Sequence, residues 1–408
     1  MRTAALLLAL AAAALGQSRE PGVQRALAYL KANDAAHLAK QIEIAQIPAP
    51  TFQEERRAAF MEREFRRVGL ADVSIDGQGN VLGWRRGTGG GPVFAIAAHL
   101  DTVFPDGTDV TVKRQGNRLV GPGLADDSLG LRVLLALAEA LDHGGVRTRH
   151  DLLFVANVCE EGLGDLLGMK YLFEKGPLRG RIAAFISVDG SDPARIVNGA
   201  VGSKRYRTTV RGPGGHSYGN FGRANPTHAL GRVMARLAGF QTPSSPKTTF
   251  NVGRIGGGTS VNSIAFEAWM EVDLRSESEA ELERLEQRFL EAVRLGVDDE
   301  NQFRAAAGAK LEAENKLLGV RYAGSTPADS PLVRAAEGAA QTLGFAPVLA
   351  ASSTDSNVPI KLGIPAITLG GGGRAGDAHS LNEWFEPDGA YKGAQQVLLT
   401  VLGYDAGL

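Results

Sequence analysis

Histidine and acidic residues stand where apolar runs of this chain end, and their types suit metal binding. His99 ends the first run, Glu160 and Glu161 follow the second, Asp189 follows the third, and the fourth leads through four glycines to His379. The carboxyl ends of strands in an open α/β sheet meet at one edge. Carboxylates and histidines gathered there would repel or stay unpaired without a cation, and zinc takes both ligand types. The pattern predicts a centre in which one bridging carboxylate holds two metals.

Taken alone, the two acidic pairs are evidence of different strength for a metal centre. Asp126 begins a pair in the glycine-rich turn GPGLADDSLG, where capping of the following helix is the ordinary role. Glu160 and Glu161 follow a buried run, where two carboxylates are costly unless a cation is near. One can bind a metal while the other takes a proton from water. Asp101, two residues after His99, suits a carboxylate that orients a ligand imidazole.

The elements that must position these residues form an α/β pattern. Continuous apolar runs are typical of strands buried on both faces, and helical stretches such as 129–141 lie between them. The predicted fold is therefore an α/β domain with a mostly parallel central sheet. The four runs are residues 93–100, 152–158, 182–188 and 365–369.

A second module interrupts this domain. Alternating strands at 204–211 and 266–274, with helical stretches near 226–238 and 277–295, predict a β-α-β-β-α-β order. The expected division is a signal peptide at 1–16, the first part of the catalytic domain at 17–202, an inserted α+β domain at 203–315, and the second part at 316–408.

Composition and the first residues bear on location. The formal net charge is -1 without a basic run, which argues against nucleic acid or an anionic membrane as a partner. A basic start and an apolar run at 4–15 predict a signal peptide, too short for a permanent membrane span. We therefore expect export to the periplasm or the medium, without a membrane anchor. A single cysteine, Cys159, excludes an intrachain disulfide framework.

Five motifs, in chain order, resemble those of a known family: AAHLDTVFP, GPGLADDSLG, CEEGLGD, FISVDG and GGGGRAGDAHS. They are similar to the di-zinc exo-hydrolases that include peptidase T, carboxypeptidase G, acetylornithine deacetylase and succinyl-diaminopimelate desuccinylase. The resemblance implies two Zn²⁺ per chain, with Co²⁺ or Mn²⁺ as substitutes. It implies that His99 and Asp189 hold one zinc, that Glu161 and His379 hold the other, and that Asp126 bridges them.

Further roles follow from the same resemblance. Glu160 would be the general base and later the acid, Asp101 would orient His99, and the peptide bond after Asp126 would be cis. The inserted domain resembles the family's lid or dimerisation domain, which implies a homodimer.

The resemblance also implies that residues of the inserted domain contact the substrate. His216 of GPGGHS would stabilise the oxyanion, often from the partner subunit, and Asn262 and Arg275 would bind the substrate. A charge on a strand surface is an equally good reading of Arg275. The glycine run would let the amides of Gly371 and Gly372 approach a substrate carboxylate.

Two departures from the family pattern refine the substrate. Ser128 stands where many members have Lys. Deacylases and carboxypeptidases usually have Glu at the position of Asp189, and the Asp found here is more similar to peptidase T and related aminopeptidases. We therefore expect an exopeptidase that cleaves di- or tripeptides, with an N-acyl amino acid amidase as the alternative.

Two other classes remain as alternatives. Ser217 fits G-x-S-x-G, and Asp355 and His379 follow in the order of a serine hydrolase triad. That motif requires a buried strand running straight into a helix, whereas the strand here alternates and the next helix begins near Pro226. A non-catalytic relative that only binds is the second alternative, against which the complete ligand set and Glu160 argue.

Overall fold

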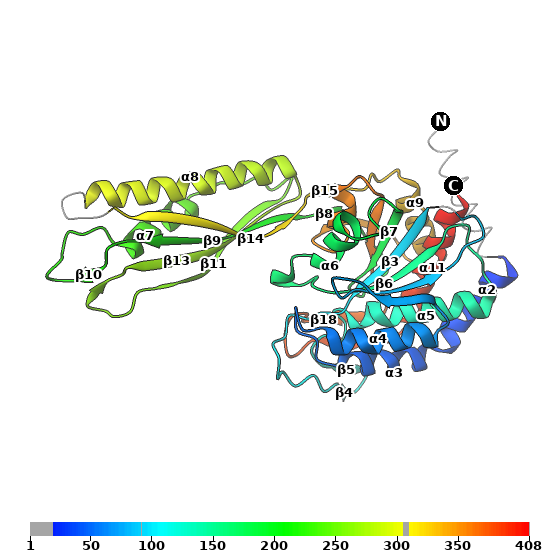
Figure 1. Cartoon of the computed structure of the whole chain (residues 1–408). Coiled ribbons are helices and arrows are strands. Elements are labelled where there is room, and N and C mark those ends of the chain that lie inside the picture. The colour runs from blue at the N-terminus through cyan, green and yellow to red at the C-terminus, as the bar shows by residue number, and fades with distance from the viewer. Residues whose placement is uncertain (1–18, 91, 305–309, 408) are drawn as a thin grey trace. The chain divides into compact units, whose positions relative to one another are not determined.

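The computed structural model describes residues 19–90, 92–304 and 310–407, and the chain divides into two compact units (Figure 1). The main unit comprises the chain up to Ala200 together with Ser325 onward, and the insert spans Val201–Gly324. The predicted signal peptide lies outside the described residues. The prediction ended the insert at residue 315, but β14 (Glu312–Arg321) stays paired with its neighbour to Arg321, so the insert is longer.

The main unit is built on a nine-stranded sheet in the order β1-β2-β6-β3-β7-β17-β8-β15, with β16 paired to β8. Strand β3 lies between β6 and β7, parallel to both, and β17 is parallel to β7, so the centre of the sheet is parallel as predicted. The strands are β1 (Ala71–Ile75), β2 (Val81–Arg85), β3 (Val93–His99), β6 (Leu152–Asn157), β7 (Ile182–Val188), β8 (Arg195–Ala200), β15 (Gly324–Ser325), β16 (Val348–Ser352) and β17 (Ala366–Leu369).

Helices cover both faces of this sheet, which is why its central strands are apolar throughout. In β3, Phe94 and Ile96 pack into one core, and Ala95 and Ala97 pack into the other. The first core is covered by α2 (Pro21–Ala32), α3 (Asp34–Ala45), α4 (Glu55–Arg67), α5 (Ser128–Gly144), α9 (Pro331–Thr342) and α11 (Tyr391–Ala406). The second is covered by α6 (Leu167–Lys170), the π-turn η2 (Tyr171–Lys175) and α10 (Asn357–Lys361).

A small antiparallel sheet joins two segments that carry predicted ligands. Its order is β18-β19-β5-β4, and β19 pairs with β5. Strand β5 precedes the turn with Asp126, and β19 follows the loop with His379. The strands are β4 (Lys113–Gln115), β5 (Arg118–Val120), β18 (Arg374–Gly376) and β19 (Trp384–Glu386).

The insert is a four-stranded antiparallel sheet in the order β11-β13-β9-β14, with α7 and α8 on one face. Burial alternates along β13, whose inward residues pack on the helices, as the alternating sequence predicted. The elements are β9 (Gly202–Arg211), β10 (Gly215–His216), α7 (Pro226–Ala238), β11 (Thr248–Gly257), β12 (Ser263–Ile264), β13 (Glu267–Ser276), α8 (Glu279–Phe303) and β14.

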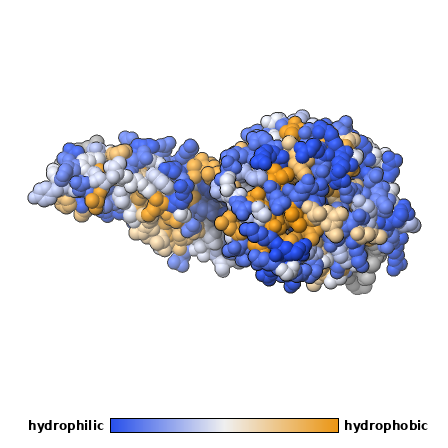
Figure 2. Space-filling view, turned by 90° about the horizontal axis from the view of Figure 1, so that it is seen from below, coloured by the Kyte–Doolittle hydropathy of each residue, from blue (hydrophilic) through white to orange (hydrophobic). Residues whose placement is uncertain are grey.

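The surface carries both polar and apolar residues. On the face of the main unit in Figure 2, hydrophobic patches lie among hydrophilic residues. Every helix within the described residues is too short or too polar to cross a bilayer.

Candidate metal centre

The five predicted metal ligands lie together in the main unit. Coordinating atoms of His99, Asp126 and Asp189 lie within 4.8 Å of one another, and the same holds for Asp126, Glu161 and His379. Each group therefore has three ligands, and Asp126 belongs to both. Strand order explains the convergence, because His99 and Asp189 stand at the carboxyl ends of the adjacent parallel strands β3 and β7.

His99 is held so that one ring nitrogen faces the site. Its Nδ1 donates to the backbone carbonyl of Asp101 at 3.0 Å, and its Nε2 lies 3.0 Å from Oδ1 of Asp126. A carbonyl that accepts from one nitrogen leaves the lone pair of the other for a metal. The prediction gave this orienting role to the Asp101 carboxylate. That carboxylate lies 3.5 Å from Nδ1, so the carbonyl is the closer partner.

The Asp101 carboxylate instead holds the loop with the acidic pair. It accepts N–H groups from Glu160 and Glu161, each at 2.9 Å, and the hydroxyl of Thr51 at 2.9 Å. Coordinating atoms of Glu160, Glu161 and His99 also lie within 4.8 Å of one another. The predicted general base is therefore buried beside the ligands and fixed through its backbone.

The turn with the shared ligand is fixed from several directions. The Asp126-Asp127 peptide bond is cis, as the family resemblance implied. The side chain of Asp127 accepts from the amides of Gly130 and His99, each at 3.0 Å, so it caps α5 and ties the helix to β3. Oδ2 of Asp126 lies 3.0 Å from Nε2 of His379, which places Asp126 between the two histidines.

The electrostatics of the group show a shortage of positive charge. Burial and the nearby Asp126 raise the pKa of Asp189 to about 7. Hydrogen bonds with Asp126 and Glu161 raise the pKa of His379 to about 10. Burial opposes a charge on His99, yet the Asp101 and Asp126 carboxylates hold its pKa well above its usual value. Divalent cations would balance the carboxylates without added protons, and the histidine and carboxylate donors fit such ions.

Two supporting residues were missed in the sequence. Arg57 is fully buried, and it donates to the backbone carbonyls of Ile47 and Leu100 at 2.7 and 2.8 Å. Burial lowers its pKa to about 10, although the charge of Asp101 favours the cation. Glu383 accepts hydrogen bonds from the turn that ends at Asp126. Both act through backbone groups, which carry no sequence signal.

Two of the predicted substrate residues lie together in the insert. His216 pairs with Ser263 between β10 and β12, and the carbonyl of Asn262 accepts from the amide of Ser217 at 2.9 Å. Arg275 lies near the Ser276 end of β13, far along the strand from β12, and its Nε donates to the carboxylate of Asp273 at 2.6 Å. The structure thus groups His216 with Asn262 and separates both from Arg275.

The expectation for Gly371 and Gly372 is corrected. The amide of Gly371 donates to the carbonyl of Gly190 at 2.8 Å, and that of Gly372 donates to Ser191 at 2.9 Å. Both donors are therefore used within the fold. The glycines allow close packing instead, because a Cβ on Gly372 would lie 2.2 Å from the carbonyl oxygen of Ala390.

The serine hydrolase alternative lacks its local structure. Ser217 follows the two-residue strand β10 and is succeeded by turn residues, and α7 begins only at Pro226. A nucleophile elbow joins a buried strand directly to a helix.

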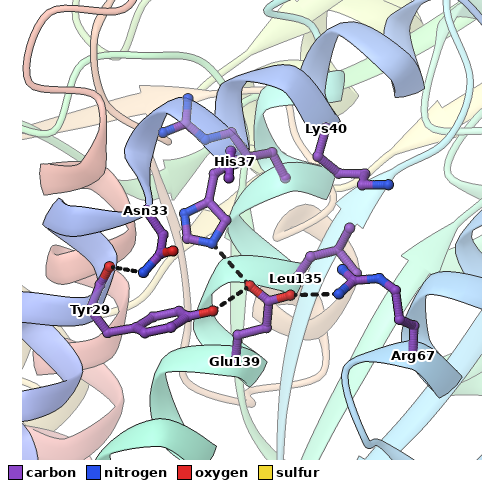
Figure 3. A pocket seen from close by; sticks show the side chains of 9 residues that line it. Tyr29, Asn33, His37, Lys40, Arg67, Leu135 and Glu139 are labelled. Atoms are coloured by element: carbon purple, nitrogen blue, oxygen red, sulfur yellow. Dashed lines mark hydrogen bonds and ion pairs between the residues drawn. The ribbon is translucent and has the colours of Figure 1, made fainter.

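A second cluster of histidine and carboxylate lies between α2, α3, α4 and α5 (Figure 3). We call Tyr29, His37, Arg67 and Glu139 the Glu139 cluster. Glu139 accepts from His37 at 3.0 Å, from Arg67 at 2.9 Å and from Tyr29 at 3.2 Å. They line a cavity of about 340 Å³, and their polar groups point toward one another.

Comparison with known proteins agrees with this geometry. Residues 95–402 match peptidase family M20/M25/M40. The chain is 25% identical to the uncharacterized protein YqjE of Bacillus subtilis, over 90% of this chain and 98% of that protein. It is 24% identical to a succinyl-diaminopimelate desuccinylase of Corynebacterium glutamicum, over 65% and 73%. A tripeptidase from Staphylococcus aureus shares the fold, with a TM-score of 0.75 and 23% identity, over 92% and 99%. The chain belongs to peptidase family M20/M25/M40.

Proposed function

We propose that this chain is a two-metal hydrolase that cleaves an amide bond in di- or tripeptides. The observation that carries the proposal is the pair of three-ligand groups that share Asp126. Zn²⁺ suits the histidine and carboxylate donors, and Co²⁺ or Mn²⁺ can take its place. His99 and Asp189 would hold one ion, and Glu161 and His379 the other. When bound, such ions polarise a carbonyl and make water more acidic.

Glu160 would carry the proton transfers. Its backbone is fixed by Asp101, and its carboxylate lies among the ligand atoms. It takes a proton from the attacking water and passes it to the nitrogen of the leaving amine.

His216 is suited to stabilise the oxyanion. Its Nδ1 accepts from the amides of Tyr218 and Gly219, each at 3.2 Å. In the neutral ring the proton is then on Nε2, which is exposed and can donate to an oxygen that gains negative charge.

The separation of His216 and Arg275 supports a homodimer. His216 lies beyond the Glu267 end of β13, and Arg275 is eight residues along that strand, or about 26 Å. A tripeptide spans at most about 11 Å. Both residues could act on one small substrate only if they came from different copies of the chain.

Complementation tests this arrangement. Glu160→Ala and His216→Ala, each strongly impaired alone, should regain activity when mixed and allowed to exchange, because a mixed dimer holds one intact site. The mass of the protein in solution gives the oligomeric state directly. A mixture without activity would refute the shared site.

The substrate and the metals are tested together. Metal-loaded protein is offered dipeptides, tripeptides and N-acyl amino acids, with and without a chelator, and its metal content is measured. We expect two ions per chain and chelator-sensitive cleavage of small peptides. Preference for N-acyl amino acids would favour the amidase alternative, which the match to the desuccinylase supports.

We also propose export, from the basic start and the apolar run at 4–15. The N-terminal sequence of the protein recovered from the cell envelope or the medium tests it. An intact residue 1 would argue against cleavage near residue 16.

A further inference from the structure

We propose that Glu383 is a positioning residue of the metal centre, whose carboxylate holds Asp126 in place relative to His379. The inference rests on the proposed two-metal function and assigns a residue that the ligand pattern does not include. Glu383 is fully buried and lies four residues after His379 in the chain.

The carboxylate binds three backbone amides of one turn. Oε1 accepts from Ala125 at 2.6 Å and from Asp126 at 3.0 Å, and Oε2 accepts from Gly123 at 3.1 Å. Two oxygens that span three donors fix both the position and the tilt of the turn.

The backbone of Glu383 ties the same two segments together. Its carbonyl accepts from the amide of Gly121 at 2.9 Å, and its amide donates to the carbonyl of Ser380 at 3.1 Å. Glu383 therefore bonds to the residue after His379 and to the segment leading to Asp126. These two ligands belong to the same three-residue group, although they lie far apart in the chain.

An apolar side chain in the place of Glu383 would leave the three backbone amides of the turn without their acceptor, which costs free energy for each buried donor left unpaired. These donors all lie in the turn that ends at the shared ligand. When that support is lost, Asp126 can shift, and the metals that it contacts bind more weakly.

Glu386 provides a matched control. It lies three residues further on in β19, it is also buried, and it pairs with Arg118 at 2.7 Å and with Arg374 at 2.5 Å. Its partners are side chains rather than the Asp126 turn. Glu383→Gln and Glu386→Gln are therefore the same substitution at neighbouring positions, and only the first disturbs the turn.

The experiment titrates metal-free protein with Zn²⁺ or Co²⁺ by calorimetry and follows the absorption of bound Co²⁺. In Glu383→Gln, the side-chain NH₂ cannot accept from Gly123, so one hydrogen bond to the turn is lost. We expect metal affinity to fall about 10- to 100-fold, the range for residues that orient ligands. The Co²⁺ spectrum should also change, whereas Glu386→Gln should retain the affinity and spectrum of the wild type.

The outcomes separate this inference from the proposed function. Folded Glu383→Gln with wild-type affinity and spectrum overturns the role of Glu383 and leaves the two-metal centre standing. Wild-type protein that binds fewer than two ions overturns both. If Glu383→Gln does not fold, Glu383→Asp carries the test, because a carboxylate one methylene shorter remains an acceptor but is drawn away from the three amides of the Asp126 turn. Unchanged affinity in Glu383→Asp would then overturn the inference.

Discussion

Two clusters of histidines and carboxylates in the main unit differ in their charge balance. In the Glu139 cluster, one carboxylate accepts from a histidine, an arginine and a tyrosine. In the Asp126 cluster, defined as His99, Asp126, Glu161, Asp189 and His379, three carboxylates face two histidines. In the Glu139 cluster, the carboxylate finds its hydrogen-bond donors among its own neighbours, which indicates a structural role. The Asp126 cluster is balanced only when positive charge is added, which distinguishes a functional site from a structural one.

The largest expected effect is on turnover. Glu160→Ala removes the proposed proton carrier beside the Asp126 cluster, and turnover should fall by about 10²- to 10⁴-fold. The ligands remain, so bound metal should stay at two ions per chain. Peptide hydrolysis and elemental analysis measure the two quantities. Near wild-type turnover in this variant would remove Glu160 from the mechanism.

Bound metal should stabilise the folded protein through the Asp126 cluster and not through the Glu139 cluster. At a free metal concentration 100 times Kd, each site should add about 2.7 kcal/mol to the free energy of unfolding. Denaturant unfolding with and without chelator measures this gain. His379→Gln should reduce it, and Glu139→Gln should not. Equal stability with and without metal would contradict the proposed centre.

Disruption of the Glu139 cluster should cost stability without affecting chemistry. Glu139→Gln weakens the acceptor of His37, Arg67 and Tyr29, and we expect a loss of about 1–3 kcal/mol in unfolding free energy. Turnover and metal content should match the wild type when both proteins are folded. A large loss of activity at full metal loading would show that the cluster is more than structural.

The same variant should show a defined pH dependence. Burial opposes ionisation of Glu139, but hydrogen bonds from His37 and Arg67 outweigh it and lower its pKa below the ordinary value of 4.5. A lowered folded pKa gives stability that is present above the unfolded pKa and is lost as pH falls through the folded value. The stability difference between wild type and Glu139→Gln should therefore be full at neutral pH and shrink below about pH 4.5. A difference that grows in acid would contradict this assignment.

The smallest effect is expected at Ser217. Ser217→Ala should change turnover by no more than about twofold, since it lies outside both clusters and alters only a surface loop. A loss of about 10³-fold or more would restore the serine hydrolase alternative.

The sequence predicted most of the central fold because its signals are local. Apolar runs became β3, β6, β7 and β17, and helix α7 matches its predicted range. The last strand of the predicted β-α-β-β-α-β order is β14, whose position was not predicted because six of its ten residues are exposed and give no apolar pattern.

The site was predictable in its ligand types and much less in its support. His99 and Asp189 carry their chemistry in their side chains, and the ends of adjacent strands place them together. Arg57 and Glu383 work through carbonyl and amide groups, which every residue has. The expectation for Gly371 failed for the same reason, because a sequence does not show which carbonyl an amide will meet.

The connection between the two units has a consequence for how this chain can vary. In the main unit, the amide of Thr326 donates to the carbonyl of Asn198 at 2.8 Å, and in the insert Ser203 pairs with Arg321. The chain therefore departs and returns at neighbouring points, and the whole insert is one continuous stretch of gene between them. Recombination at these points could replace the insert in a single event, while the strands and ligands of the metal centre keep their register.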